Sequence, residues 1–179
     1  AASLGKIFRN SLFDFPKNNF LIAEKKSCID LNKKLDLISK KYKIGISWRS
    51  RTDTTLLGPA KSLNLNLLLP ILKMNQFTFI NLQYGDTVDE INHFYNNTKI
   101  KIHTIKEVDL FNDFESISAL AKNLDLFITV SNSTAHVSAA LGVPTWVIKP
   151  KNHSVFHYWN QPNDTTPWYS EKSIKLFSY

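Results

Sequence analysis

The stretch FITVSNSTAHVSAALGVPTWVI, residues 127–148, decides the fold. It opens with β-branched and aromatic residues, passes through small polar residues, and continues as an alanine-rich segment with helical character. Gly142 and Pro144 then end the expected helix, and a second apolar run, PTWVI, follows. A strand, a helix and another strand in this order predict a crossover unit with two parallel strands.

The same alternation extends over most of the chain. Apolar runs typical of strands occur at residues 43–48, 77–82, 100–105, 125–130 and 144–148. Segments with helical spacing occur at residues 63–72, 88–95, 114–123 and 134–141. The sequence therefore predicts an α/β fold, a three-layer Rossmann-like domain with a mostly parallel sheet. The tail, residues 151–179, is expected to form an irregular loop and a short helix that packs back.

The composition of the 179-residue chain is that of a globular protein, with 43% hydrophobic residues. No apolar run approaches the roughly 20 residues needed to cross a bilayer. The chain begins without Met and without the apolar block of a signal peptide, and we interpret it as a cut from a longer protein. The single cysteine, Cys28, excludes an internal disulfide and favours a reducing compartment, so the expected location is cytoplasmic.

The net charge of +7 is concentrated near the N-terminus, because residues 1–43 hold ten Lys and Arg against four Asp and Glu. Lysine pairs in this segment alternate with leucines at helical intervals, which predicts an amphipathic helix with a solvated basic face. A polyanion-binding face is the alternative interpretation. The sequence contains neither a zinc-finger spacing nor an RNA-binding signature, so nucleic acid is not an expected partner.

The candidate site follows from the fold, since ligands of parallel α/β sheets bind beyond the carboxyl ends of the strands. Four turns follow such ends, at residues 48–63, 81–86, 108–115 and 130–136. The five glycines form neither a dinucleotide fingerprint nor a P-loop, which excludes both of those phosphate sites. A helix N-terminus can still hold an anion through its N–H groups and partial positive charge.

The turn VSNSTAH, residues 130–136, offers such a helix N-terminus. Either Ser131 or Asn132 would cap the helix, and the hydroxyls of Ser133 and Thr134 would add donors. The His136 side chain would lean back toward the helix start and face a bound phosphate. The alternative is that the turn is only a good N-cap and that His136 is a half-buried filler.

Several segments in one order carry a family resemblance. They are IGISWRS (44–50), KSLNLNLLLPIL (61–72), FINLQYGD (79–86), residues 109–148, and PWYSEKSIKLF (167–177). Together they resemble the C-terminal, donor-binding half of a glycosyltransferase of the GT-B fold, specifically the heptosyltransferase-like domain of bacterial tetratricopeptide-repeat proteins. The resemblance implies that residues 43–179 form a nucleotide-sugar-binding Rossmann-like domain. Residues 1–42 would be the end of a preceding domain and a basic helical connector.

The resemblance also implies where a nucleotide-sugar donor lies across the carboxyl ends of the strands. Trp48, Arg49 and Ser50 would border the phosphates, and Lys61 would take the place of a basic residue common in the family. Gln83 and Tyr84 would line the nucleotide cleft. The residues expected to hold the diphosphate are Ser131, Asn132, Ser133, Thr134 and His136.

The implied chemistry is glycosyl transfer from a nucleoside-diphosphate sugar to an acceptor that the sequence does not name. No metal is expected, because His153 and His157 lack an acidic or Cys third ligand. No cofactor is expected either. The negative charge of the leaving group would be stabilised by helix N–H groups, Arg, Lys or His. The general base normally comes from the other domain, so this chain alone is expected to be inactive and to work with the rest of its own longer chain.

Two positions depart from the family pattern. Relatives often carry an acidic residue at the position of Ser131, and Ser50 replaces a usual glycine. These departures indicate a different donor or weak binding. The alternative function is therefore a degenerate, non-catalytic domain that acts as an interaction module.

Overall fold

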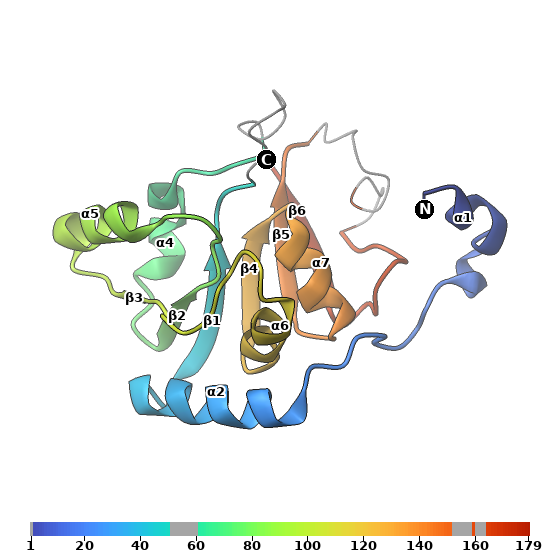
Figure 1. The fold of residues 1–179 in the computed structure, drawn as a ribbon. Coiled ribbons are helices and arrows are strands. Elements are labelled where there is room, and N and C mark those ends of the chain that lie inside the picture. The colour runs from blue at the N-terminus through green and yellow to red at the C-terminus, as the bar shows by residue number, and fades with distance from the viewer. Residues whose placement is uncertain (1, 51–60, 152–158, 160–163) are drawn as a thin grey trace.

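The structure, a computed structural model, describes residues 2–50, 61–151, 159 and 164–179. Six strands form one sheet in the order β3-β2-β1-β4-β5-β6, and every neighbouring pair is parallel (Figure 1). The strands are β1 (Tyr42–Ser47), β2 (Phe77–Asn81), β3 (Ile102–His103), β4 (Leu126–Val130), β5 (Thr145–Lys149) and β6 (Ile174–Ser178). This strand order is that of the dinucleotide-binding Rossmann fold, so the predicted α/β class is confirmed.

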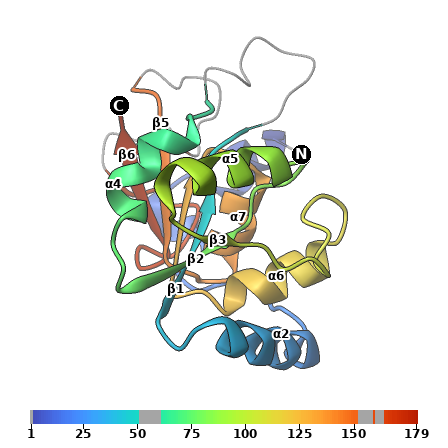
Figure 2. The same cartoon turned by 90° about the vertical axis from the view of Figure 1, so that its left-hand side faces the viewer.

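The helices cover the sheet on two sides (Figure 2). The helices that do so are α2 (Lys25–Ile38), α4 (Leu69–Leu72), α5 (Val88–Thr98), α6 (Phe114–Lys122) and α7 (Ser133–Ala140), with the 3-10 turn η2 (Leu65–Leu68). The helix α1 (Ala2–Phe8) and the 3-10 turn η1 (Leu12–Asp14) precede them in the chain. On one side, α2 and α6 pack on Ile80 and Phe127 through buried leucines and isoleucines. On the other side, η2, α4 and α5 pack on Ile44 and Phe79. These two core clusters make the domain three-layered.

The lysine-rich segment forms α2, as the periodicity predicts. Leu31 and Leu35 are buried in the same cluster as the sheet residue Phe127, while the lysines face solvent. Lys34 pairs with Glu107 at 3.2 Å, an exposed ion pair. The helix therefore shares the core of the sheet domain, and a domain division between residues 42 and 43 stays a prediction.

The expected short helix in the tail is wrong, because residues 174–178 form the edge strand β6. Ile174 and Leu176 are buried beside β5, whereas Lys175 and Phe177 point to the exposed side. This two-residue alternation is the pattern of a strand with one covered face. The covered face joins a small core with Val147 and the alanines of α7.

The crossover unit within residues 125–149 has the predicted form, since β4, α7 and β5 follow one another and the two strands pair in parallel. Gly142 ends the helix with a φ of 77°, a conformation that glycine adopts without strain. An added Cβ there would also run into the side-chain amide of Asn19. Close by, the backbone N–H groups of Phe20 and Leu21 both donate to the Ala140 carbonyl. The chain before α2 is thus fastened to the C-terminal end of α7.

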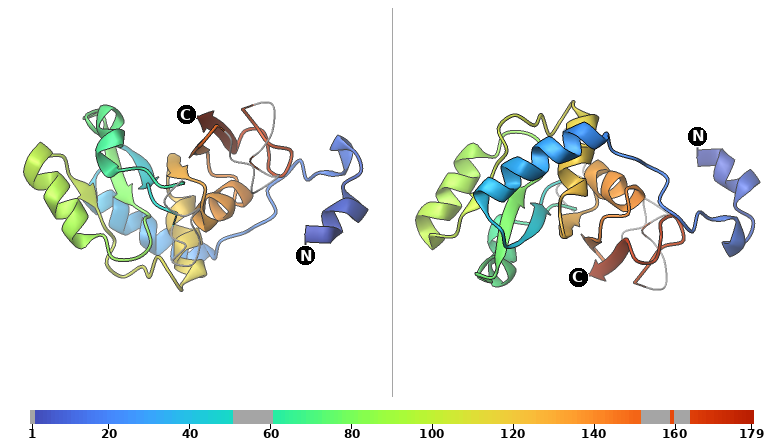
Figure 3. Two further views of the ribbon diagram at one scale, coloured as in Figure 1. Left: turned by 90° about the horizontal axis from the view of Figure 1, so that it is seen from above. Right: turned by 90° about the horizontal axis from the view of Figure 1, so that it is seen from below.

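The N-terminal helix α1 lies at the edge of the molecule in Figure 1 and in both views of Figure 3. The segment that follows it touches the body through Phe15, whose ring meets the edge of Trp168 at 4.9 Å between centroids. The apolar side chains of Leu4, Ile7 and Phe8 are more than half exposed. Among the helices in the described part of the chain, none is both long and apolar enough to cross a membrane.

Candidate functional site

A buried amide fixes the turn that follows β1. The Gln83 side chain is 1% exposed, and its Oε1 accepts hydrogen bonds from the Ser47 hydroxyl and from the backbone N–H groups of Trp48 and Arg49, at 2.7 to 2.9 Å. Its Nε2 donates to the Tyr84 carbonyl at 3.0 Å. Gln83 follows β2, so this amide ties the carboxyl ends of two adjacent strands together.

A second amide extends the network to β4. Asn132 Oδ1 accepts from the Ala135 N–H at 3.0 Å, which makes Asn132 and not Ser131 the N-cap of α7. Its Nδ2 donates to the Ser47 hydroxyl oxygen at 2.9 Å. The strand order reverses between β1 and β4, and ligands of such sheets bind at that point. The Ser47–Asn132 hydrogen bond spans it.

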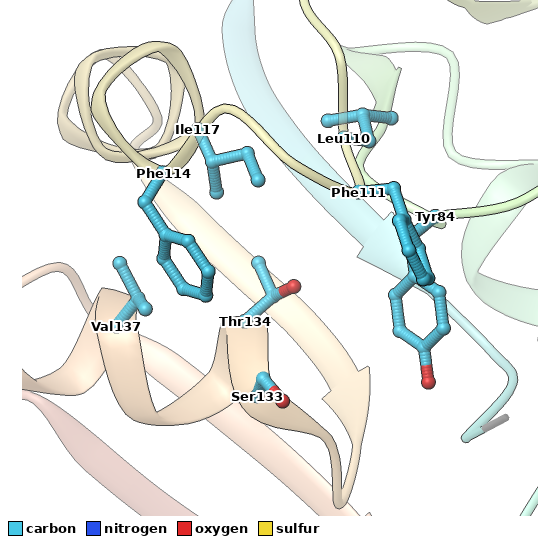
Figure 4. Close-up of a pocket in the computed structure, with 8 residues that line it drawn as sticks. All are labelled: Tyr84, Leu110, Phe111, Phe114, Ile117, Ser133, Thr134 and Val137. Atoms are coloured by element: carbon cyan, nitrogen blue, oxygen red, sulfur yellow. The ribbon is translucent and has the colours of Figure 1, made fainter. Parts of the chain in front are cut away.

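An aromatic-walled pocket of about 190 Å³ opens beside the first turn of α7. Figure 4 shows Tyr84 and Phe111 together on one side, Phe114 and Val137 on the other, and the hydroxyl side chains of the helix between them. The lining residues are Tyr84, Leu110, Phe111, Phe114, Ile117, Ser133, Thr134 and Val137. Drug-sized ligands occupy roughly 300 Å³ or more, so this pocket suits one part of a larger molecule.

Sequence reasoning selected the turn at residues 108–115 but missed its two phenyl groups as site residues. The acidic residues of the turn shape the backbone: Asp109 accepts from the Phe111 N–H at 2.8 Å, and Asp113 caps α6 through the Ser116 N–H at 3.0 Å. A hydrogen bond from the Asn112 side chain contributes most to lowering the pKa of Asp109. The exposed rings of Phe111 and Phe114 are thereby presented at the pocket.

The Arg49 side chain is turned toward the first turn of α5. Its guanidinium donates to the Asp86 carbonyl at 3.0 Å and lies 3.2 Å from a carboxylate oxygen of Glu90. The other Glu90 oxygen accepts the indole N–H of Trp48 at 2.8 Å. Trp48 is fully buried in the core, beneath the guanidinium, which lies 5.9 Å from the centre of its ring. The structure therefore places Trp48 as a support for Arg49, with its indole away from solvent.

Ser50 and Lys61 lie at the two ends of the turn after β1. The Ser50 N–H donates to the Ser62 hydroxyl at 3.0 Å, which joins these ends. Lys61 is buried, and its burial lowers the pKa of the ammonium group. Neither side chain belongs to the aromatic-walled pocket.

The His136 imidazole packs against two rings of the tail. It stacks on Trp159 with 4.4 Å between ring centroids, and its Nδ1 lies 2.5 Å from the Tyr169 hydroxyl. Burial lowers the pKa of His136 to about 4, so the ring is neutral at pH 7. It does not line the pocket that Ser133 and Thr134 enter. A part for His136 in holding a diphosphate stays a prediction.

In residues 2–50, 61–151, 159 and 164–179, no group of three or more His, Cys, Asp or Glu side chains comes together. His153 and His157 lie outside the described residues.

A basic groove of about 380 Å³ lies near the amino ends of β1 and β2. Its lysines are Lys41, Lys73, Lys99 and Lys101. Lys73 and Lys99 are the C-cap residues of α4 and α5, and cations are favoured at helix C-termini by the helix dipole. Two of these four lysines are therefore explained by their positions at helix C-termini.

Comparisons with known proteins find similarity in both sequence and structure. No protein-family model matches the chain. Protein FlbA of Caulobacter vibrioides is 27% identical over 165 residues, which cover 91% of this chain and 26% of FlbA. The chain thus spans about a quarter of the length of that relative.

Two solved structures share the fold. E. coli ADP-heptose LPS heptosyltransferase II is 15% identical with a TM-score of 0.58, and the match covers 96% of this chain and 49% of that one. The glycosyl transferase family 9 protein from Veillonella parvula is 10% identical with a TM-score of 0.60, covering 93% of this chain and 43% of its own. The chain therefore has the Rossmann-like fold of one part of a GT-B glycosyltransferase.

Proposed function

We propose that this chain is the donor-binding domain of a GT-B glycosyltransferase and holds the diphosphate of a nucleotide-sugar at the N-terminus of α7. One observation carries the proposal. The hydrogen-bonded network of Gln83, Ser47 and Asn132 fixes the ends of β1, β2 and β4 so that the first turn of α7 opens beside an aromatic-walled pocket. A helix start of this kind offers N–H donors and a partial positive charge to an anion.

The proposed roles follow from the positions of the side chains. The hydroxyls of Ser133 and Thr134 would donate to phosphate oxygens, and Tyr84 with Phe111 would pack on a flat part of the ligand. Gln83 and Asn132 act through the backbone that they position. The proposed donor domain comprises residues 43–179, and residues 1–42 connect it to the part of a longer chain that supplies the acceptor site and the base.

The first test is a thermal-shift screen with UDP, ADP and GDP at about 1 mM. A dissociation constant near 0.1 mM would stabilise the fold by about 1.4 kcal/mol, which raises Tm by about 3–5 °C for a domain of this size. The matching nucleosides, which lack phosphates, are the control and are expected to give a much smaller shift. Absence of a shift with all three diphosphates contradicts the proposal.

Arg49→Ala is expected to weaken the binding of the best nucleoside diphosphate about tenfold. This is the low end of the loss for a charged hydrogen bond, and it applies because the Arg49 side chain is 39% exposed. Isothermal titration calorimetry measures the change. Arg9→Ala removes an exposed arginine from the N-terminal segment and is expected to leave the affinity unchanged. Equal affinities of the two variants would move the anion site away from Arg49.

A second candidate function is a non-catalytic interaction module. It is favoured because two side chains expected at the diphosphate already have partners within the protein. Arg49 pairs with Glu90, and the neutral His136 stacks on Trp159. The full-length protein separates the two functions, because an interaction module transfers no sugar from any nucleotide-sugar.

A further inference from the structure

The backbone and the side chain of Arg49 face different helices. Its carbonyl oxygen lies 3.5 Å from the Asn132 amide nitrogen, at the cap of α7. Its guanidinium instead reaches the first turn of α5, where it meets Glu90 at 3.2 Å. A basic side chain that adjoins the proposed diphosphate site is thus held by a carboxylate on the neighbouring helix.

Glu90 makes a hydrogen bond with a neutral donor and also an ion pair. Its Oε1 accepts the Trp48 indole N–H, a bond that an amide oxygen can also accept. The contact with Arg49 is instead an ion pair, which exists only while Glu90 is negatively charged. The two side chains are 39% and 32% exposed, although the Glu90 Oε2 atom that faces Arg49 is buried and accepts no hydrogen bond from the described residues, so the ion pair lacks a close hydrogen bond and is open to competition. A diphosphate, which carries more charge than one carboxylate, can compete for the same guanidinium.

We infer that Glu90 is a positioning residue, which holds the Arg49 side chain against α5 and thereby sets the affinity of the site for diphosphates. This inference rests on the proposed function. A phosphate that binds at the start of α7 must take the guanidinium from Glu90 or share it. The carboxylate lowers affinity in either case, because it competes with the phosphate for the guanidinium of Arg49.

Glu90→Gln tests the inference, since it removes the charge and keeps an acceptor for Trp48. Binding of ADP and of inorganic pyrophosphate is measured by isothermal titration calorimetry, and a three- to tenfold gain in affinity is expected for both. Asp89→Asn is the matched control: it removes one charge from the same helical turn, where Asp89 is exposed. A gain of less than twofold is expected there. If Glu90→Gln binds no more tightly than Asp89→Asn, the inference is overturned.

Two further measurements exclude a merely structural effect. In an Arg49→Ala background, Glu90→Gln is expected to change pyrophosphate affinity by less than twofold, because the two side chains act as a pair. Adenosine binding is expected to be the same in the wild type and Glu90→Gln. A gain that persists without Arg49, or that extends to adenosine, contradicts the inference.

The outcomes also separate the inference from the proposed function. If neither pyrophosphate nor any of the three nucleoside diphosphates binds the wild type or the Glu90→Gln variant, both fail. If they bind and Glu90→Gln brings no gain, only the role of Glu90 fails. Circular dichroism and urea unfolding of each variant verify the fold, and should Glu90→Gln not fold, Glu90→Met provides a second uncharged side chain of similar length with the same expected gain.

Discussion

Gln83→Met is expected to lower the free energy of unfolding by about 4 kcal/mol, measured by urea denaturation. The substitution keeps the length of the side chain but removes the acceptor of the Ser47 hydroxyl and of the Trp48 and Arg49 N–H groups. Each buried donor left without a partner costs about 1–3 kcal/mol, and some of these groups will find new partners. The turn after β1 is then no longer tied to β2.

Gln76→Met is the control for this change. Gln76 is exposed, so the same exchange of an amide for a thioether is expected to alter the free energy of unfolding by less than about 0.5 kcal/mol. A loss of under 1 kcal/mol in Gln83→Met would show that the buried amide does not hold the turn. A loss of Arg49-dependent nucleotide binding at temperatures where the variant is folded is also expected.

Acidification is expected to destabilise the protein by about 3 kcal/mol through His136 alone. Its pKa is lowered to about 4 by burial, whereas an unfolded histidine titrates near 6.5. The unfolded chain therefore takes up a proton first. The free energy of unfolding is highest above pH 6.5, decreases as pH falls from about 6.5 to 4, and changes no further through His136 below about pH 4. The free energy of unfolding, measured between pH 7 and pH 4, reports the loss.

His136→Phe retains a ring against Trp159 and cannot titrate, so its loss of stability between pH 7 and pH 4 is expected to be smaller by about 3 kcal/mol. Carboxyl groups contribute to acid denaturation in both proteins and cancel in the comparison. His93→Phe exchanges an exposed histidine of α5 for the same ring and is the matched control for the substitution itself. Parallel curves for wild type and His136→Phe would contradict burial of a neutral imidazole.

The crossover units could be predicted from the sequence because the signals that define them are local. Apolar runs mark β4 and β5, and Gly142 marks the end of α7, all within about 20 residues. β6 was missed because a five-residue edge strand has only two buried side chains, Ile174 and Leu176, to show its period.

The candidate site was less accessible to sequence reasoning because its side chains meet over long separations. The helix position of His136 predicted that the ring leans toward the start of α7, but the partners that bury it come from the tail, at Trp159 and Tyr169. Likewise, the pairing of Arg49 with Glu90 joins two turns whose approach depends on β1 and β2 being neighbours.

The central place of β1 has a consequence during synthesis of the chain. One side of this strand pairs with β2, which follows soon after it, but the other side pairs with β4, which begins at Leu126. Until the ribosome has delivered β4, the nascent sheet ends in an uncovered, apolar edge, which invites association with other chains. Chaperone dependence and the solubility of C-terminal truncations should therefore change abruptly at that strand.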